Sequence, residues 1–210
     1  MAFVIAVAQR KGGAGKSTLA ANLATAFACS GKTVALLDTD PQKTLARWHE
    51  LRAGAGARAA PLHFDSPSGW RIPATLDKLR AASDVILLDT PPHADTDARI
   101  AIRAADLVLV PLQPSPADLW AMDATLDLAG AERRPAAVIM NRVPAAGRLP
   151  AETLAALHAR GLTVLEPAIG NRAGFAQAFA AGLGVSEHAP RSAAANEIRA
   201  LAAALATHAP

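Results

Sequence analysis

A glycine-rich stretch near the start of the chain has the composition of a polyphosphate-binding loop. Residues 9–18 read QRKGGAGKST, between an apolar run of strand length and an Ala/Leu-rich helical stretch. Glycines permit backbone conformations closed to other residues, so several N–H groups can turn toward one anion, and the N-terminal end of the following helix adds positive charge. In such a loop Lys16 would reach the terminal phosphates and the Ser17 hydroxyl would ligate Mg²⁺. Arg10 stands where the general phosphate-loop pattern has its first glycine. The alternative is a strand-to-helix turn with an exposed lysine.

Three aspartates stand where a magnesium site would need them. Asp38 and Asp40 follow the second predicted strand, and Asp89 follows the third. The carboxyl ends of adjacent parallel strands meet at one edge of a sheet, where carboxylates can hold Mg²⁺ directly or through water. Each aspartate could instead cap a following helix, Asp40 most readily, because Pro41 suits the first position of a helix. The residues alone leave both roles open.

Strands and helices alternate along the chain, which is the pattern of a parallel sheet. The expected strands are continuous apolar runs with no polar face, as for strands that helices cover on both sides. Ala- and Leu-rich stretches such as residues 17–30 supply the helical crossovers. We therefore expect an α/β fold with a doubly wound, mostly parallel sheet flanked by helices on both faces. The strands are expected at residues 3–8, 33–37, 84–88, 106–112, 136–140 and 162–165.

Length and composition favour one folded domain. The chain has 210 residues, of which 51% are hydrophobic, and residues 1–210 are expected to form a single domain. This composition excludes a disordered chain. The lone Cys29 excludes an internal disulfide and a metal or iron–sulfur site built from thiolates alone. No apolar run approaches the roughly 20 residues that span a bilayer, and we expect a cytoplasmic protein.

Charge is spread unevenly along the chain. The formal net charge of +3 is too small to indicate a nucleic-acid binder by itself, but the middle third is acidic and both ends are basic. Arg172, Arg191 and Arg199 could gather into a basic patch in a compact fold. The alternative is that these arginines lie on solvated helix faces.

Lys11 makes the phosphate loop more specific. Residues 11–17 (KGGAGKS) match the deviant Walker A pattern K-G-G-x-G-K-[ST], and here the chain resembles the ParA/MinD family of partition and positioning ATPases. Residues 38–42 (DTDPQ) resemble the family's switch I, and residues 87–92 (LLDTPP) resemble its Walker B motif and switch II. Two further stretches stand where the family has its later strands: residues 108–119 and 139–143. The resemblance covers essentially the whole chain.

The resemblance implies an ATP and Mg²⁺ site built by these motifs. It implies that Ser17, Asp38 and Asp89 organise the metal, that Asp40 positions or activates the attacking water, and that Asn141 reads the adenine base. A buried asparagine that satisfies loop backbone is the alternative for Asn141. The expected catalytic residues are Lys11, Lys16 and Asp40, and the expected nucleotide contacts are Lys11, Gly12, Gly13, Ala14, Gly15, Lys16, Ser17, Thr18 and Asn141.

Lys11 raises a question of charge, because Lys16 already serves the terminal phosphates. A second lysine beside it in an empty site would suffer like-charge repulsion. The resemblance implies that Lys11 crosses a two-fold interface to the partner subunit's nucleotide, so a homodimer is expected on ATP binding. A charge supplied in trans accelerates phosphoryl transfer by orders of magnitude. The alternative is a solvated loop lysine.

The function that the resemblance implies is a weak Mg²⁺-dependent ATPase that segregates plasmid or chromosomal DNA. The ATP-bound dimer would bind nonspecific DNA at the nucleoid through Arg172, Arg191 and Arg199. A ParB-like or other small DNA-binding adaptor would stimulate hydrolysis and release the dimer. The chain leaves no room before Lys11 for the helix-turn-helix domain of larger ParA proteins, so it resembles the short plasmid-type subgroup.

Two alternatives keep the nucleotide switch and change its target. The cargo could be a chemoreceptor cluster or a carboxysome-like body, which the sequence does not separate from DNA. A MinD-like membrane cycle is less favoured, because residues 195–208 carry one arginine and no aromatic residue. No stable membrane association is therefore expected.

The sequence makes less specific predictions for a few other residues. Residues 111–116 resemble a stretch near the self-association surface of small ParA proteins, or they are a simple loop before a helix that starts near Ala117. Trp48, Trp70 and Trp120 are expected to be packing residues, since they are too scattered for base stacking. His93 could sense the nucleotide state, although a solvated histidine is the simpler expectation.

Overall fold

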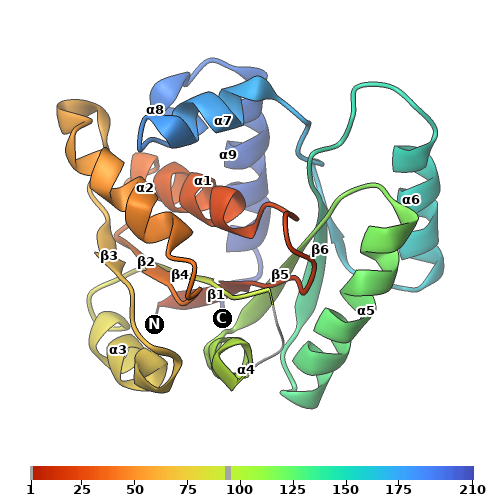
Figure 1. Cartoon of the computed structure of the whole chain (residues 1–210), viewed down its shortest axis with the longest axis horizontal. Coiled ribbons are helices and arrows are strands. Elements are labelled where there is room, and N and C mark those ends of the chain that lie inside the picture. The colour runs from red at the N-terminus through yellow and green to blue at the C-terminus, as the bar shows by residue number, and fades with distance from the viewer. Residues whose placement is uncertain (1, 93–95) are drawn as a thin grey trace.

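A computed structural model describes residues 2–92 and 96–210, and over these residues one sheet of seven strands forms the centre of the molecule (Figure 1). The strand order is β3-β2-β4-β1-β5-β6-β7, and each neighbouring pair is parallel. Crossing from β1 to β4 on one side and to β5 on the other makes the sheet doubly wound. The strands are β1 (Phe3–Val7), β2 (Val34–Asp38), β3 (His63–Asp65), β4 (Val85–Asp89), β5 (Leu107–Leu112), β6 (Ala136–Met140) and β7 (Val164–Leu165).

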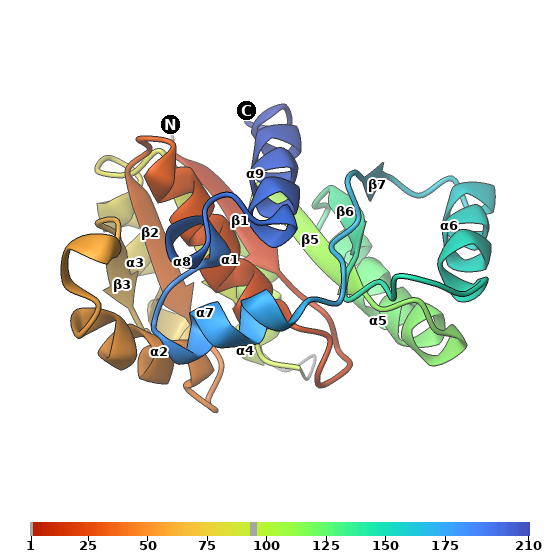
Figure 2. The same ribbon diagram turned by 90° about the horizontal axis from the view of Figure 1, so that it is seen from above.

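Helices cover both faces of the sheet. Figure 1 shows α1 (Lys16–Cys29), α2 (Thr44–Ala53), α7 (Ala173–Ala180), α8 (Val185–His188) and α9 (Ala193–Ala206) on one face. The apolar cores place α3 (Ile72–Leu79), α4 (Thr96–Ala104), α5 (Pro116–Ala131) and α6 (Leu149–Ala159) on the other, with short 3₁₀ turns η1 (Gly56–Arg58) and η2 (Gly69–Arg71) between elements. Figure 2 shows β3 and α2 toward one end of the sheet and β7 and α6 at the other. None of the described helices is long and apolar enough to cross a membrane.

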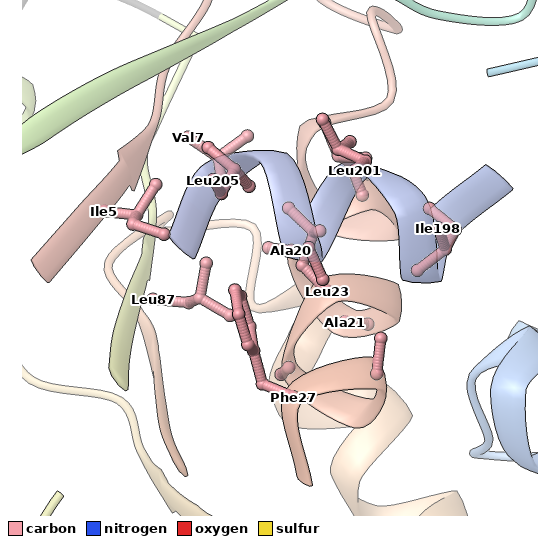
Figure 3. Close-up of a cluster of buried hydrophobic side chains, with 14 of the residues drawn as sticks. Ile5, Val7, Ala20, Ala21, Leu23, Phe27, Leu87, Ile198, Leu201 and Leu205 are labelled. Carbon is pink, nitrogen blue, oxygen red and sulfur yellow. The ribbon is translucent and has the colours of Figure 1, made fainter. Parts of the chain in front are cut away.

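The pleat of each strand divides its side chains between two apolar cores. In β1, Ile5 and Val7 enter the core under α1 and α9, while Val4 and Ala6 enter the core under α3 and α4. Figure 3 shows the first core, where side chains of α1 and α9 lie together beside Ile5 and Val7. Every residue of β1, β2, β4 and β5 is buried. This two-sided burial explains the continuous apolar runs.

The α/β fold predicted from the sequence is confirmed, with differences at the edges of the sheet. All six expected strands are present, but the expected strand at 162–165 is reduced to β7. Strand β3 was not predicted, because it has three residues and its His63 and Asp65 are exposed. An edge strand with polar, exposed positions lacks the apolar pattern on which the other predictions rest.

The expectation that all three tryptophans pack inside is wrong for two of them. Trp48 is fully buried, but Trp70 and Trp120 are 72% and 73% exposed. Asp118 and Met122 are the buried positions of α5 around Trp120, and they turn toward the sheet. A residue two positions from each of them lies about 200° around the helix, and Trp120 therefore points outward.

A buried ion pair joins α2 to the α7–α8 segment. The Arg52 guanidinium donates to Glu187 Oε2 at 2.9 Å and Oε1 at 2.6 Å, and the two side chains are 5% and 1% exposed. Glu187 also accepts the N–H groups of Ala60 at 2.7 Å and Gly184 at 2.9 Å. Arg52 further donates to Gly182 O and lies over the Trp48 ring. The pair is therefore desolvated but well provided with hydrogen bonds.

Replacing Glu187 by Ala would leave the Arg52 guanidinium buried without its counter-charge. We expect Glu187→Ala to lower the free energy of unfolding by about 3 to 5 kcal/mol, measured by urea denaturation of the ligand-free chain. Glu50→Ala is the control, because its ion pair with Arg47 is exposed and worth about 1 kcal/mol or less. Equal costs for the two substitutions would show that the buried pair does not hold α2 in place.

Candidate nucleotide-binding site

The phosphate loop lies at the carboxyl edge of the sheet, between β1 and α1. Helix α1 begins at Lys16, and within residues 2–92 and 96–210 no side chain caps its N-terminus. Its first N–H groups are therefore left for a ligand. Gly13 and Gly15 have φ of 78° and 91°, in the left-handed region that favours glycine. The loop thus presents an uncapped helix N-terminus where the sequence predicts a polyphosphate.

Side chains that directly follow β5 and β6 hold this loop from outside. The Gly13 carbonyl accepts N–H bonds from Gln113 Nε2 at 2.9 Å and Arg142 Nη1 at 3.1 Å, and the Ala14 carbonyl accepts one from Asn141 Nδ2 at 2.9 Å. In a planar trans peptide the N–H points opposite to the carbonyl. The N–H groups that follow Gly13 and Ala14 therefore point away from the three holding side chains. The motif comparison with the family did not identify Gln113 or Arg142, which lie in distant segments.

Asn141 donates a hydrogen bond to the loop backbone, which was the alternative to recognition of the adenine base. Its buried amide fixes the loop, and a Cβ built on Gly15 would lie only 2.7 Å from Asn141 Nδ2. The φ of Gly15 favours glycine, and a side chain there would also displace the Asn141 amide. Asn141 also lines the adjacent cavity described below, so its position leaves the base-binding prediction standing.

Lys16 lies inside the site. Its side chain is buried, and Nζ donates to the Gln9 carbonyl at 3.1 Å. Burial lowers the pKa of Lys16, while the carboxylates of Asp89 and Asp40 act to raise it. The Lys16 ammonium thus lies near two carboxylates and donates a hydrogen bond to a backbone carbonyl. A phosphate oxygen could take the place of that carbonyl as the acceptor.

Asp89 is a fully buried carboxylate whose oxygens have no hydrogen-bond partner in the described part of the chain. Burial raises the pKa of Asp89 to about 7, and the neighbouring carboxylates of Asp38 and Asp40 also raise it. Ser17 and Lys16 lie close enough to lower the pKa, but neither completes a hydrogen bond to Asp89. Buried polar atoms are normally paired, so an orphaned carboxylate beside a phosphate loop indicates a missing ligand.

The other two aspartates are engaged with backbone. Asp38 is fully buried, and its oxygens accept N–H bonds from Asp40 at 3.1 Å and from Ala46, in the first turn of α2, at 3.0 Å. Burial raises the pKa of Asp38, and these bonds oppose the rise. Asp40 Oδ1 accepts the Gln42 N–H at 2.9 Å. Helix α2 begins at Thr44, so Asp40 does not cap a helix that starts at Pro41.

These residues fit a Mg²⁺ ion that completes its shell with phosphate and water oxygens. The described residues contain no cluster of three or more His, Cys, Asp or Glu side chains that could hold a metal alone. Mg²⁺ commonly binds through one or two protein oxygens together with the substrate's phosphates. The orphaned carboxylate of Asp89 and the hydroxyl of Ser17 provide such oxygens. Asp38 is less available, because both of its oxygens already accept backbone N–H groups.

A cavity of about 170 Å³ opens beside the loop, where a base would follow the phosphates. Its walls include Thr18, Asn141, Arg172 and Phe175. Arg172 was expected on a DNA-binding surface, but here its Nε donates to the Glu197 carboxylate at 3.0 and 3.1 Å. Glu197 also accepts the Gly170 N–H at 3.1 Å. The charge of Arg172 is therefore paired at the rim of this cavity.

The other two arginines of the expected basic patch are exposed. Arg199 Nη1 donates to the Pro190 carbonyl at 2.9 Å, which holds α9 against the segment that carries Arg191. Their role in DNA binding remains a prediction. The prediction for His93 lies outside the described residues.

Lys11 makes an ion pair with its own chain. Its Nζ bonds to Asp118 Oδ2 in the first turn of α5, and the two side chains are 39% and 1% exposed. Asp118 is also held by the Ser115 hydroxyl, at 2.5 Å, and Ser115 caps α5 by accepting the Asp118 N–H. The expected loop-to-helix transition after residues 111–116 is thus confirmed, with α5 starting at Pro116. The spacing Ser115-x-x-Asp118 is a capping pattern, so the sequence contained a signal for this site.

The raised pKa of Asp89 predicts a stability that depends on pH. The folded-state value of about 7 lies above the ordinary 3.8, so the favourable contribution is complete below pH 3.8 and is lost as pH rises toward 7. Asp89→Asn removes this titration. Without ligand, we expect the unfolding free energy of the variant to exceed that of wild type by an amount that grows as pH rises. Between pH 5 and 8 this difference should increase by about 2 to 3 kcal/mol, measured by urea denaturation.

Asp77→Asn, which removes an exposed carboxylate on α3, controls for the change in net charge. A difference between Asp89→Asn and wild type that stays constant across this pH range would contradict the raised pKa of Asp89.

Comparisons with known proteins show the family of this chain. Residues 5–185 match the family of CobQ/CobB/MinD/ParA nucleotide binding domains. The chain is 29% identical to the maintenance of carboxysome distribution protein A of Halothiobacillus neapolitanus (94% of this chain, 93% of the relative) and 30% identical to the chromosome-partitioning ATPase Soj of Thermus thermophilus (94% and 93%). The solved structure of cobyrinic acid a,c-diamide synthase from Mycobacterium smegmatis, with a bound ATP analogue and magnesium, has a TM-score of 0.79 at 22% identity (99% of this chain, 95% of that one).

The family and the ATPase class expected from the sequence are therefore confirmed, whereas ATP and Mg²⁺ at this site remain a prediction. The short form, with the phosphate loop directly after the first strand, is consistent with these relatives. This chain belongs to the ParA/MinD family of P-loop ATPases.

Proposed function

We propose that this ATPase is a partition switch in which two copies face each other across bound ATP, and that the dimer binds DNA until hydrolysis separates it. The position of Lys11 is the observation that carries the proposal. Lys16 lies at the loop's own phosphate site, while Lys11 is turned to Asp118 on α5. A lysine that its own site does not use is available to a nucleotide bound by a second copy.

Each copy supplies most of the hydrolytic site. The N–H groups at the start of α1 and the Lys16 ammonium bind the β- and γ-phosphates. Asp40, whose Oδ1 is fixed by the Gln42 N–H, orients the attacking water through Oδ2. Mg²⁺ held at Ser17 and Asp89 would supply a Lewis acid that neutralises phosphate charge. The second copy adds its Lys11 to the charge that develops on the transferred phosphoryl group.

Lys11 can leave Asp118 without stranding a buried charge. Once the ion pair opens, the Asp118 carboxylate keeps the Ser115 hydroxyl at 2.5 Å and the Gln113 N–H at 3.4 Å. An isolated buried carboxylate would be strongly disfavoured, but hydrogen bonds offset that cost. Lys11 is already 39% exposed, so its ion pair is only partly desolvated. The exchange from Asp118 to a phosphate is therefore energetically accessible.

The cargo we propose is DNA, carried with a ParB-like or other small DNA-binding adaptor that stimulates hydrolysis. The relatives support this, since they include the chromosome-partitioning ATPase Soj and a protein ParA from Rhizobium radiobacter that is 31% identical over 84% of this chain. Arg191 and Arg199 are exposed cations that could contact phosphates at the nucleoid, with Arg172 beside the nucleotide. Such contacts read no sequence, as a nucleoid-bound cytoplasmic switch requires.

A protein cargo is the second candidate function. The observation that favours it is the relative from Halothiobacillus neapolitanus, whose name refers to carboxysome distribution. The same nucleotide switch and DNA-bound dimer serve this alternative, and the adaptor would then bind a protein assembly.

Lys11→Ala tests the proposed dimer. With Mg²⁺ and a nonhydrolysable ATP analogue, we expect wild type to dimerise and Lys11→Ala to remain a monomer in sedimentation velocity, because the charge supplied across the interface is lost. Wild-type turnover should be far below the enzyme median of roughly 10 s⁻¹. Lys78→Ala, an exposed lysine on α3, is the control and should dimerise normally. Normal dimerisation of Lys11→Ala would remove the trans role of this lysine.

The double substitution Arg191→Ala/Arg199→Ala tests DNA binding. We expect the analogue-bound dimer of this variant to bind nonspecific duplex DNA at least about tenfold more weakly, with a shallower dependence on salt, because fewer counterions are released. Fluorescence anisotropy at several salt concentrations measures both quantities. Arg148→Ala, an exposed arginine at the start of α6, is the control. An unchanged salt slope in the double variant would place the DNA surface elsewhere.

A further inference from the structure

Ser66 lies beside the segment that carries Asp40. Strand β3 pairs with β2 at the edge of the sheet, and the register places Asp65 opposite Leu37 (Figure 1). One residue further along both strands, Ser66 comes beside Asp38, the last residue of β2. The Ser66 hydroxyl donates to the Asp38 carbonyl at 3.1 Å. The short edge strand β3 therefore brings a hydroxyl to the start of the segment in which Asp40 lies.

The same hydroxyl also bonds to the far end of this segment. Lys43 Nζ donates to Ser66 Oγ at 2.6 Å. Lys43 directly precedes α2 and has φ of 53°, in the left-handed region that non-glycine residues rarely adopt. Its side chain thus reaches back toward the start of the segment, and Ser66 joins the two ends of residues 38–43.

Between these ends, the bonds of Asp40 are local. Asp40 Oδ1 accepts the Gln42 N–H at 2.9 Å, and the Asp40 carbonyl accepts the Lys43 N–H at 2.9 Å. Both donors belong to the same segment, so these bonds fix the shape of the turn but not its place in the site. Thr39 attaches one side of the segment to β4, because its N–H and Oγ1 donate to the Asp89 carbonyl at 3.0 and 2.7 Å. Ser66 supplies the attachment on the other side, where residues 41–43 are exposed.

The residues that follow β3 give Ser66 a fixed support. Pro67 and Gly69 are buried, and a Cβ built on Gly69 would overlap the side chain of Asp97 in α4. This close approach packs the backbone after Ser66 against α4, while the backbone before it is paired with β2. Ser66 is therefore held on both sides and can act as an anchor for the exposed segment.

We infer that Ser66 is a positioning residue for ATP hydrolysis, which fixes the place of the Asp40 carboxylate by bonding to both ends of residues 38–43. This inference rests on the proposed function, in which Asp40 orients the attacking water. Reacting groups must lie within about 3 to 3.5 Å in aligned geometry, and small displacements cost large factors in rate. Ser66 is not part of the phosphate loop, so its loss should slow hydrolysis without weakening the binding of ATP.

Phosphate release by the full chain with Mg²⁺ and ATP tests the inference. We expect Ser66→Ala to lower kcat about tenfold or more, with less than about a twofold change in KM and in affinity for a nonhydrolysable ATP analogue. Ser66→Thr keeps the hydroxyl and should restore most of the lost rate. Ser68→Ala is the matched control, because it makes the same substitution at an exposed serine of the same segment. Its kcat should equal that of wild type.

Lys43→Met tests whether the two bonds act together. It removes the ammonium from an exposed position and should lower kcat by about threefold or more. Because Ser66→Ala already removes the Lys43 bond, the double variant should be no more than about twofold slower than Ser66→Ala. Effects that multiply in the double variant would overturn the coupling through Ser66. If urea denaturation shows Ser66→Ala to be unfolded, Lys43→Met decides the inference, and a wild-type kcat in that variant would overturn it.

Asp40→Ala, measured alongside, separates this inference from the proposed function. An inactive Asp40→Ala together with a wild-type kcat in Ser66→Ala would overturn the inference and leave the proposed function standing. A loss in Ser66→Ala that appears in KM with kcat unchanged, or a Ser66→Thr variant no faster than Ser66→Ala, would overturn it as well. Wild-type turnover by Asp40→Ala would exclude Asp40 from the mechanism, and the positioning role of Ser66 with it.

Discussion

The outward-facing carbonyls of the phosphate loop are the constraint on which the site depends. A peptide can present its N–H to an anion only if its carbonyl is satisfied on the other side, and here Gln113, Arg142 and Asn141 satisfy the carbonyls of Gly13 and Ala14. These three side chains follow β5 and β6. The parallel order of β1, β5 and β6 is therefore what brings them to the loop, and the fold positions the anion site through its strand order.

Unsatisfied charge is concentrated at the same edge of the sheet. Asp89 has no hydrogen-bond partner in the described part of the chain, and the pKa of Lys16 is lowered by burial. Both conditions disfavour the ligand-free state, and the proposed phosphate and cation would relieve both together. Perturbed buried groups of this kind are typical of functional sites. Lys11 and Asp118 form the contrasting case of a pair already satisfied without ligand.

Local sequence predicts strands and motifs that are built from adjacent residues. It does not predict contacts between residues that lie far apart in the sequence. The strands from β1 to β6, apart from β3, follow from apolar runs, and the phosphate loop follows from seven adjacent residues. The resemblance to ParA proteins suggested a DNA contact for Arg172, but its ion pair with Glu197, 25 residues away on α9, could not be predicted from local sequence. The outward direction of Trp120 depends on which face of α5 meets the sheet, which a helix of low amphipathicity does not reveal. Such pairings become visible only when the topology is known.

Two buried contacts hold helix α2 in place, one at each end of the helix. At its start α2 is held by the buried Asp38, which bonds to the Ala46 N–H, and near its end by the buried pair of Arg52 and Glu187. Both anchors are desolvated, so breaking either is costly. Residues 41–43 between Asp40 and the helix are exposed, and Lys43 has φ of 53°, an uncommon value for a non-glycine residue. The exposed segment that follows Asp40 is therefore the part of this region that the two buried anchors do not hold.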